Sequence, residues 1–487
     1  MATVLPETRA TDKRPPGQAA PRQRRAPGLA VAVTPLVAMG FLLGIGYGVY
    51  HLPSTVLLIL AAFVTGSLGL VLGFGWREME RGIVEAITKA MPAILVVLAI
   101  GMLIGSWLAC GTIPMVIYYG LEVISPRFFL VTACLACSIV SMATGTSYGT
   151  VGTIGVAFIG IATGLGIPLG AAGGAIIAGA YFGDKMSPLS ATTNLAPVAA
   201  GANLFDNIRH MMWSGGLAWL LGLLSYLVVG FGYGGNATET EAMRLVTDTL
   251  AHSFRFHWLL LLPIAIVFYF AVTKRPIVPS MIVSSLVAGV LAVVFQASSI
   301  AEVVSAMNTG YRAQTGVPQV DQLLSRGGIM SMMETQTVAF AAFSFGGIMQ
   351  STGLLAVLLA RVQRFANRVW SLVSATIGAA LLTAIVTGSS FLSIIIPAEL
   401  FAPLYIKQGL AAKNLARIVE EAGAIMVPLI PWSIAGVYMA TTMGVPTFTY
   451  LPWAIMNYAS VLLLALYGVT GFTMARRIRE DETEIGS

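Results

Sequence analysis

The chain has 487 residues, of which 57% are hydrophobic and only 10% are charged, and its mean hydropathy is +0.84. A soluble domain carries about a quarter charged residues, so this composition excludes a soluble globular protein. The net charge of +6 comes mainly from basic residues at segment ends and in the tails, which argues against nucleic acid as a partner and for a lipid bilayer.

Apolar windows close to the bilayer-crossing length of about 20 residues recur along the whole chain. They predict an all-α, polytopic membrane protein. Some windows can be half-helices that enter and leave on one side, so we expect about 10–14 membrane segments. In chain order the windows are 29–50, 53–74, 91–109, 127–144, 150–166, 168–182, 211–231, 257–273, 277–296, 330–350, 370–387, 390–406, 422–443 and 449–474.

Basic tails set the expected orientation. Residues 1–28 mix Pro and Gly with an excess of Lys and Arg, which is typical of a disordered tail that stays in the cytoplasm. A cleaved signal peptide is the rival interpretation, but the first apolar window is long and lacks a clear small-residue cleavage site. Arginines in the tail at 475–487 place the C-terminus on the same side. We therefore expect an even number of crossings in the cell (inner) membrane, with both termini cytoplasmic.

The chain divides into an N-terminal membrane half at 29–231, connecting loops and helices at 232–329, and a C-terminal membrane half at 330–474. An amphipathic piece at 76–90 is expected to lie along the membrane surface.

Short patterns recur in the same order in the two halves. The pattern Thr-Gly-Thr-Ser-Tyr at 144–148 is echoed by Thr-Gly-Ser-Ser-Phe at 387–391. The pattern Gly-x-x-Met-x-Pro-Leu occurs at 183–189 and again at 423–429. Gly, Pro and Thr are common in membrane helices, so chance is the alternative. Paired Gly/Pro-interrupted segments in corresponding halves otherwise indicate the binding site of a secondary transporter near the bilayer midplane.

The sequence lacks the motifs of an enzyme or an ATP-driven motor. Cys134 and Cys137 stand one turn apart on a probable helix, with no further Cys/His cluster to complete a metal or redox site. No Gly-x-x-x-x-Gly-Lys-[Ser/Thr] loop occurs, and no soluble catalytic domain interrupts the apolar windows. We expect no structural metal and no cofactor beyond Na⁺ or H⁺ as the coupling ion.

Asp184 is the main candidate for proton or cation coupling. An intramembrane carboxylate is costly and usually faces a cavity, forms an ion pair or carries protons. A proton and a metal cation would then compete for the same group. The alternative is a structural pair with Lys185 or Arg209 at the membrane edge, and Lys185 can equally snorkel to the interface.

Hydroxyl and amide side chains near the helix breaks are candidate ligands for a small ion or a polar solute, although they can also serve only as helix caps. These are Thr144, Thr146, Ser147, Ser187, Ser190, Thr192, Thr193, Asn194, Ser389 and Ser390. Glu334 lies in an otherwise apolar stretch and is a possible additional acid, or it marks the aqueous end of its segment. Glu420 and Glu421, near Lys413 and Arg417, are interpreted as a solvated helix start.

The run from Gly183 to Pro197 resembles the NhaC-type Na⁺/H⁺ antiporter family of the ion transporter superfamily, which includes malate/lactate-linked antiporters. The likeness extends over most of residues 75–470, including Glu421-Ala422-Gly423 and the run 428–432. It implies two inverted structural repeats with broken helices and re-entrant hairpins that work by alternating access. It also adds Trp432 and Ser433 to the candidate ligands and leaves a homodimer open.

The departures from the family pattern fall within the presumed site. Ala191 stands where the family usually has an acid, and Ser389-Ser390 stand where it usually has Asp-Gln. The leading hypothesis is a secondary transporter of the NhaC type that exchanges Na⁺ or H⁺. The alternative, motivated by the two missing acids, is H⁺- or Na⁺-coupled transport of a small organic solute such as an amino acid or a carboxylate. A membrane receptor that transports nothing is a remote third alternative.

Overall fold

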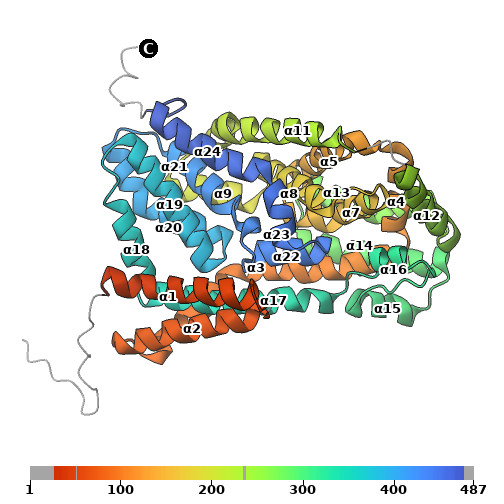
Figure 1. Cartoon of the computed structure of the whole chain (residues 1–487), viewed down its shortest axis with the longest axis horizontal. Helices are drawn as coiled ribbons and strands as arrows, with labels where there is room; N and C mark the ends of the chain where they lie inside the picture. The colour runs from red at the N-terminus through yellow and green to blue at the C-terminus, as the bar shows by residue number, and fades with distance from the viewer. Residues whose placement is uncertain (1–26, 51, 234–236, 477–487) are drawn as a thin grey trace, which may run out of the picture.

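The computed structural model describes residues 27–50, 52–233 and 237–476. Across these ranges the regular structure is helical, apart from one isolated bridge between Leu410 and Arg476. Both predicted tails lie almost wholly outside the described residues. Figure 1 shows an elongated molecule in which helices α3 (Trp76–Ala109) and α17 (Ile329–Ser351) run side by side along its length.

The N-terminal part of the chain forms a series of long and broken helices. Residues 76–90, expected as a separate surface piece, are instead the first part of the 34-residue helix α3, because no break separates them from the apolar stretch that follows. The remaining elements up to residue 230 are α1 (Leu29–Phe41), η1 (Leu42–Tyr47), α2 (Ser54–Val71), α4 (Thr112–Val123), η2 (Pro126–Phe128), α5 (Phe129–Thr144), α6 (Ser147–Thr150), η3 (Val151–Gly155), α7 (Val156–Gly164), α8 (Leu169–Met186), α9 (Ala191–Ala200), α10 (Leu204–Met211), η4 (Met212–Gly216) and α11 (Leu217–Gly230).

The connecting segment and the C-terminal half are also helical. The connecting segment contains α12 (Ala237–Ser253), η5 (Trp258–Leu261), α13 (Leu262–Val272), α14 (Ile277–Gln296), α15 (Ile300–Thr309) and α16 (Pro318–Leu324). The C-terminal half continues after α17 with α18 (Leu354–Gln363), α19 (Val369–Thr387), α20 (Ser390–Lys407), α21 (Ala412–Val419), η6 (Glu420–Ala424), η7 (Val427–Leu429), α22 (Ile434–Met443), α23 (Thr447–Tyr450), η8 (Leu451–Trp453) and α24 (Ile455–Thr470).

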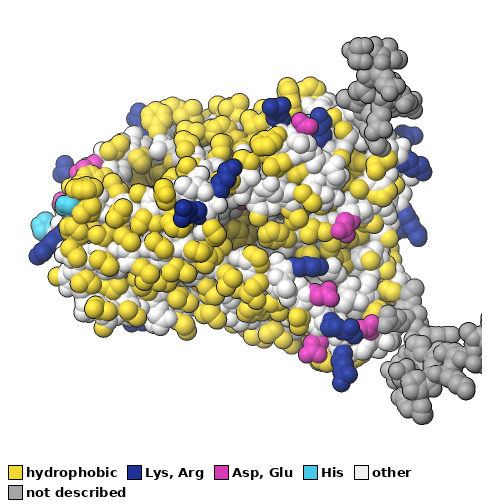
Figure 2. Space-filling model, turned by 180° about the vertical axis from the view of Figure 1, so that it is seen from behind, with side chains coloured by type: hydrophobic (Ala, Val, Ile, Leu, Met, Phe, Trp, Pro, Cys, Tyr) yellow, Lys and Arg dark blue, Asp and Glu magenta, His cyan; other side chains and the backbone are white. Residues whose placement is uncertain are grey.

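Nine helices in the described part of the chain are long and apolar enough to cross a membrane. The number rises to thirteen if four sharply bent helix pairs each count as one span. The described chain is therefore an all-α, multi-pass membrane protein. Figure 2 shows one face of the molecule covered mainly by hydrophobic side chains, with most charged side chains near the two ends and a hollow near its middle.

The order of elements repeats in the two halves. In the first, α3 and α4 are followed by α5, the helix Ser147–Gly164, α8, a break and α9. In the second, α17 and α18 are followed by α19, α20, α21 with its η6 and η7 continuation, a break and α22. Each of the helices α4 and α18 starts after a glycine with positive φ, at Gly111 and Gly353. The two halves therefore contain the same arrangement of broken helices.

Small residues bring α8 close to α5. A Cβ atom on Gly179 would meet the backbone of Cys134, and one on Gly183 would meet the backbone of Ser138. Small residues one turn apart allow two membrane helices to approach this closely. Cys134 and Cys137 are fully buried free cysteines, as expected for packing in the membrane core. The close packing of α5 and α8 thereby places the polar C-terminal ends of the two helices next to each other.

Candidate functional site

A glycine turn interrupts the helical path at the same place in each repeat. Gly145 follows α5 and Gly388 follows α19, with φ angles of 69° and 61°, a conformation that glycine adopts without a Cβ penalty. Thr146 and Ser389 then cap the next helix, and each hydroxyl accepts a backbone N–H three residues further on, at 3.2 and 3.4 Å. The predicted pairing of 144–148 with 387–391 thus corresponds to the same local structure.

A second pair of serine caps begins the helix that follows the other break of each repeat, before α9 and before α22. Ser190 caps α9 and Ser433 caps α22, and their hydroxyls accept backbone N–H groups at 3.4 and 2.8 Å. A Cβ atom on Gly145 would meet the backbone nitrogen of Ser190, and one on Gly388 would meet Cα of Ser433. In both repeats, therefore, the glycine turn lies directly against the serine cap.

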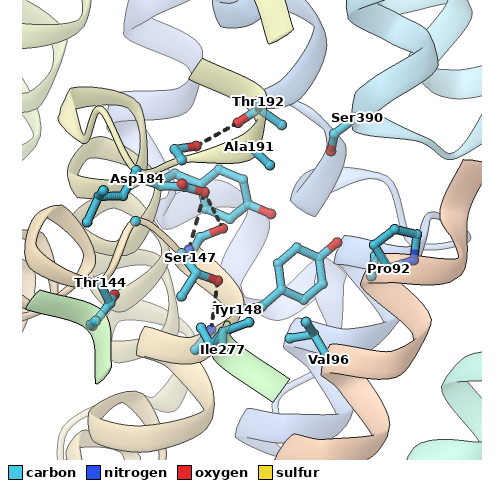
Figure 3. Close-up of a pocket in the computed structure, with 18 of the residues that line it drawn as sticks. Pro92, Val96, Thr144, Ser147, Tyr148, Asp184, Ala191, Thr192, Ile277 and Ser390 are labelled. Atoms are coloured by element: carbon cyan, nitrogen blue, oxygen red, sulfur yellow. Dashed lines mark hydrogen bonds between the residues drawn. The ribbon is translucent and has the colours of Figure 1, made fainter. Parts of the chain in front are cut away.

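A cavity of about 410 Å³ lies beside these turns. Its walls include apolar side chains of α3 and α14, such as Pro92, Val96 and Ile277, together with side chains of α13 (Figure 3). Lys274 and Arg275, in the α13–α14 connection, also line it. The predicted site residues that line the cavity are Thr144, Thr146, Ser147, Asp184, Ser190, Thr192, Ser389 and Ser390.

Asp184 is the one acidic side chain that lines this cavity in the described chain. Ser147 donates its backbone N–H at 3.2 Å and its hydroxyl at 2.8 Å to Oδ2 of Asp184, and Figure 3 shows the two residues facing each other. The second oxygen, Oδ1, is buried and has no hydrogen-bond partner among the described residues. A carboxylate with one free oxygen in a cavity wall can bind a proton or help to coordinate a cation.

Tyrosines at the cavity connect the repeats, and the sequence did not single them out. Tyr148 of the first repeat stacks on Tyr438 of the second, with ring centroids 4.8 Å apart. The Tyr438 hydroxyl donates to the backbone carbonyl of Tyr148 at 2.7 Å. Tyr181 also lines the cavity, and its buried hydroxyl has no partner in the described chain. The only signal for Tyr148 in the sequence was its position at the end of the first repeated pattern.

Three predicted ligands beside the α8–α9 break do not line the cavity. The Ser187 hydroxyl accepts a backbone N–H at 3.3 Å, and the Asn194 amide donates to two backbone carbonyls at 2.8 and 2.7 Å. Thr193 donates its hydroxyl to Glu420 at 2.8 Å. These groups stabilise the break and its surroundings.

The remaining predicted site residues of the second half, Trp432, Ser433 and Glu334, also do not line the cavity. The indole N–H of Trp432 donates to the carbonyl of Ile385 at 2.9 Å. The Ser433 hydroxyl both caps α22 and donates to the carbonyl of Val427 at 2.7 Å. Glu334 is exposed on α17 and does not line the cavity.

Glu420 and Glu421, interpreted from the sequence as a solvated helix start, are completely buried. Asn207 donates its amide to Glu420 at 3.3 Å, and Ser214 donates its hydroxyl to Glu421 at 2.8 Å. The ammonium of Lys185 lies 3.7 Å from Oε1 of Glu421. That sequence interpretation was wrong because the residues that bury these acids are distant in the chain.

Lys185 therefore neither snorkels nor forms its ion pair with Asp184, since it is 3% exposed and pairs with Glu421 of the other repeat. Arg417, one helical turn before Glu421, is also fully buried and donates to Thr473 at 3.1 Å. Among the described Asp, Glu, Lys and Arg residues, only Lys185, Arg417, Glu420 and Glu421 are buried to this extent. We refer to these four residues as the buried charge cluster.

Comparison with known proteins gives matches over most of the chain. The sequence model of the Na⁺/H⁺ antiporter family matches residues 179–472. The chain is 40% identical over 458 residues to an uncharacterized Na⁺/H⁺ antiporter of Haemophilus influenzae, covering 93% of this chain and 98% of the relative. It is 35% identical to a malate-2H⁺/Na⁺-lactate antiporter of Bacillus subtilis, over 86% of this chain and 90% of the relative. It is also 35% identical to the Na⁺/H⁺ antiporter NhaC of Alkalihalophilus pseudofirmus, over 88% and 91% of the two chains.

Proposed function

Because the chain belongs to the Na⁺/H⁺ antiporter family, we propose that it exchanges protons for a monovalent metal cation, Na⁺ or Li⁺, across the membrane. It is a secondary transporter of the NhaC type and not an enzyme. The observation that carries the proposed cargo is Asp184, whose carboxylate lines the cavity between the glycine turns with Oδ1 free.

The chemistry of exchange follows from competition for this carboxylate. When Asp184 is ionised, its oxygens attract a cation, and the hydroxyls of Ser147, Ser190 and Ser390 offer further oxygen atoms near the cavity wall. A proton on Asp184 removes the charge that holds the cation. Binding of one ion therefore weakens binding of the other, and alternating access to the two sides converts this competition into antiport.

Transport by the purified protein in liposomes tests the proposal. A pH-sensitive dye inside the liposomes should report proton movement when Na⁺ or Li⁺ is added outside, and Asp184→Asn should abolish it. Glu334→Gln is the matched control, since it removes an exposed carboxylate away from the cavity. If neither cation moves protons through the parent protein, cation/proton exchange is wrong.

A second candidate cargo is a small organic anion, exchanged with a coupling ion. The cavity volume of about 410 Å³ falls in the range typical of small-molecule sites, which starts at about 300 Å³. Lys274 and Arg275 line the cavity from its exposed side, and the N-termini of α6, α9 and α20 lie at its wall. Basic side chains and helix N-termini both favour an anion. Figure 2 shows basic side chains close to the hollow in one face of the molecule.

Uptake measurements distinguish the two cargoes. Metabolites that stabilise the purified protein against heat would be tested as radiolabelled solutes in liposomes. Saturable uptake that falls in the double variant Lys274→Gln/Arg275→Gln would support an organic anion. Absence of saturable uptake for every stabilising metabolite would reject it.

The remaining proposals concern location and assembly. We propose that the protein lies in the cell membrane with both termini cytoplasmic, from the excess of basic residues in its N-terminal tail and from the arginines that directly follow the last apolar segment. Labelling of single cysteines introduced near residues 28 and 476 in intact cells tests this orientation. We also propose Na⁺ or H⁺ as the coupling ion with no cofactor, and a homodimer whose existence a mass measurement in detergent would decide.

A further inference from the structure

The buried charge cluster joins the two repeats beside the transport cavity. Lys185 comes from the end of α8 in the first repeat and also lines the cavity. Arg417, Glu420 and Glu421 come from the α21–η6 helix of the second repeat. Glu420 and Glu421 begin the π-helical segment η6, a local distortion that is frequent at functional sites. The four charges are thus concentrated at one junction between the repeats.

The charges at this junction do not balance. Asp184, adjacent to Lys185, adds a third carboxylate to Glu420 and Glu421, while only Lys185 and Arg417 are positive. Among the described residues, the side chains of other elements buried against the junction carry no formal charge: Tyr467 of α24 lies against Arg417, Tyr405 of α20 is a buried phenol, and His210 of α10 is hydrogen-bonded to Asn414. The other charged groups nearby lie outside the buried cluster: Lys274 and Arg275 of the cavity wall and Asp206 and Arg209 of α10 are exposed, and Lys413 of α21 is only partly buried. One negative charge is therefore uncompensated when all five groups are ionised. An uncompensated charge away from water is strongly unfavourable.

The hydrogen bonds leave a place for a neutralising proton. Both oxygens of Glu420 accept hydrogen bonds, from Thr193 and Asn207. On Glu421, Oε1 accepts from Ser214 and pairs with Lys185, whereas Oε2 has no partner in the described chain. The buried Oδ1 of Asn207 also lacks a donor. Oε2 of Glu421 is consequently the oxygen of the glutamate pair to which a proton can be added without displacing a hydrogen bond.

We propose that Glu421, with Glu420, Lys185 and Arg417, forms a second proton-binding centre that shares one proton with Asp184 across the junction of the repeats. With the cavity empty, the five groups hold one proton. When a monovalent cation binds at Asp184 it supplies the missing positive charge, and the proton leaves. The centre rests on the proposed cation/proton exchange for its role in transport, but its proton can be detected without transport.

Infrared spectroscopy distinguishes a protonated carboxyl group from a carboxylate, and it can be applied to the purified parent protein at neutral pH in buffer free of Na⁺ and Li⁺. The parent should show one protonated carboxyl group, and Glu421→Gln should lose it, because the remaining four charges balance. Adding Lys185→Met to Glu421→Gln should restore it, because one negative charge is again in excess. Glu334→Gln is the control and should match the parent.

The outcomes separate this proposal from the proposed function. If Glu421→Gln keeps the signal of the parent, the proton does not depend on Glu421 and the shared centre is wrong. If the double variant, recovered as a monodisperse protein, does not regain the signal, the charge-balance argument is wrong. If the infrared signals change as expected but Na⁺ and Li⁺ move no protons in liposomes, the proton-binding centre is supported and the proposed cation/proton exchange is rejected.

Discussion

Ser190 and Ser433 occupy equivalent positions in the two repeats, where each caps the short helix that follows a break and lies against a glycine turn. Their surroundings differ. Both are buried, but Ser190 lines the cavity, whereas Ser433 does not and instead donates a hydrogen bond to the carbonyl of Val427. The same serine cap therefore faces the cavity in one repeat and supports the helix break in the other.

Replacing each cap by alanine should separate these roles. Ser433→Ala loses a cap contribution of about 1 kcal/mol and one of the two hydrogen bonds to the buried carbonyl of Val427, which keeps only the N–H of Ile430, so it should lower the thermal unfolding midpoint more than Ser190→Ala. Ser190→Ala should change transport more than stability, because its hydroxyl lies at the cavity. Unfolding followed by intrinsic fluorescence, together with liposome transport, checks both statements. Equal unfolding midpoints for the two variants would contradict the assigned difference.

The glycine turn of the second repeat should be sensitive to a side chain. Gly388→Ala forces an L-residue to φ 61°, which costs about 1–2 kcal/mol, and places Cβ against Cα of Ser433. Gly353→Ala is the matched control, since φ is 72° there but no atom lies within 4 Å of the added Cβ. We expect Gly388→Ala to lower the unfolding midpoint and the transport rate more than Gly353→Ala. Comparable losses in the two variants would show that backbone strain alone matters.

An acid at position 191 should change the preference for cations. Ala191 is exposed at the cavity, one residue from Ser190 and Thr192, and the family resemblance places a carboxylate at this position. Ala191→Asp should therefore increase the affinity for Na⁺, measured as a lower half-saturating concentration in proton exchange, because a second carboxylate can share the cation. Ala191→Asn supplies a similar shape without the charge and should leave the affinity close to that of the parent.

The loop before α16 should respond to acid. Hydrogen bonds from the backbone N–H of Thr315 at 2.6 Å and from its hydroxyl at 2.7 Å hold the pKa of Asp321 below its usual range. A carboxylate with a lowered pKa in the folded state stabilises the fold above its ordinary pKa and loses that contribution as the pH falls through the folded value. The protection factor of the Thr315 amide, which is the intrinsic hydrogen-exchange rate divided by the observed rate at the same pH, should fall in acid. In Asp321→Asn the Thr315 amide should exchange fast already at neutral pH. Slow exchange of this amide in the variant would contradict the role assigned to the Asp321 carboxylate.

The fold and the hydroxyl-lined turns could be predicted from the sequence because both depend on local patterns. Apolar windows mark the helices, and Gly followed by Thr or Ser marks the turns at Gly145 and Gly388. The cavity-lining role of Ser147 and Ser389 followed from the same signal. These features need no knowledge of which segments meet in space.

The buried charge cluster could not be predicted in this way. Glu420 and Glu421 follow Arg417 on a helix, a pattern that on its own is typical of a solvated surface. Their burial depends on Lys185 and Asn207, which are more than 200 residues away in the chain. For the same reason, the sequence could not tell that the hydroxyl of Thr193 is used by Glu420 rather than by a ligand.

The close approach of α8 to α5 has a consequence for motion. Because Gly179 and Gly183 pack directly against the α5 backbone, α8 cannot slide along α5 unless the two helices first move apart. Ser147 lies only two residues beyond Gly145, where α5 ends, so we expect its contact with Asp184 to be kept when this pair moves. We expect the displacement that opens the cavity to one side or the other to occur instead at the boundary between the two repeats, for example between α8 and η6, where Lys185 meets Glu421.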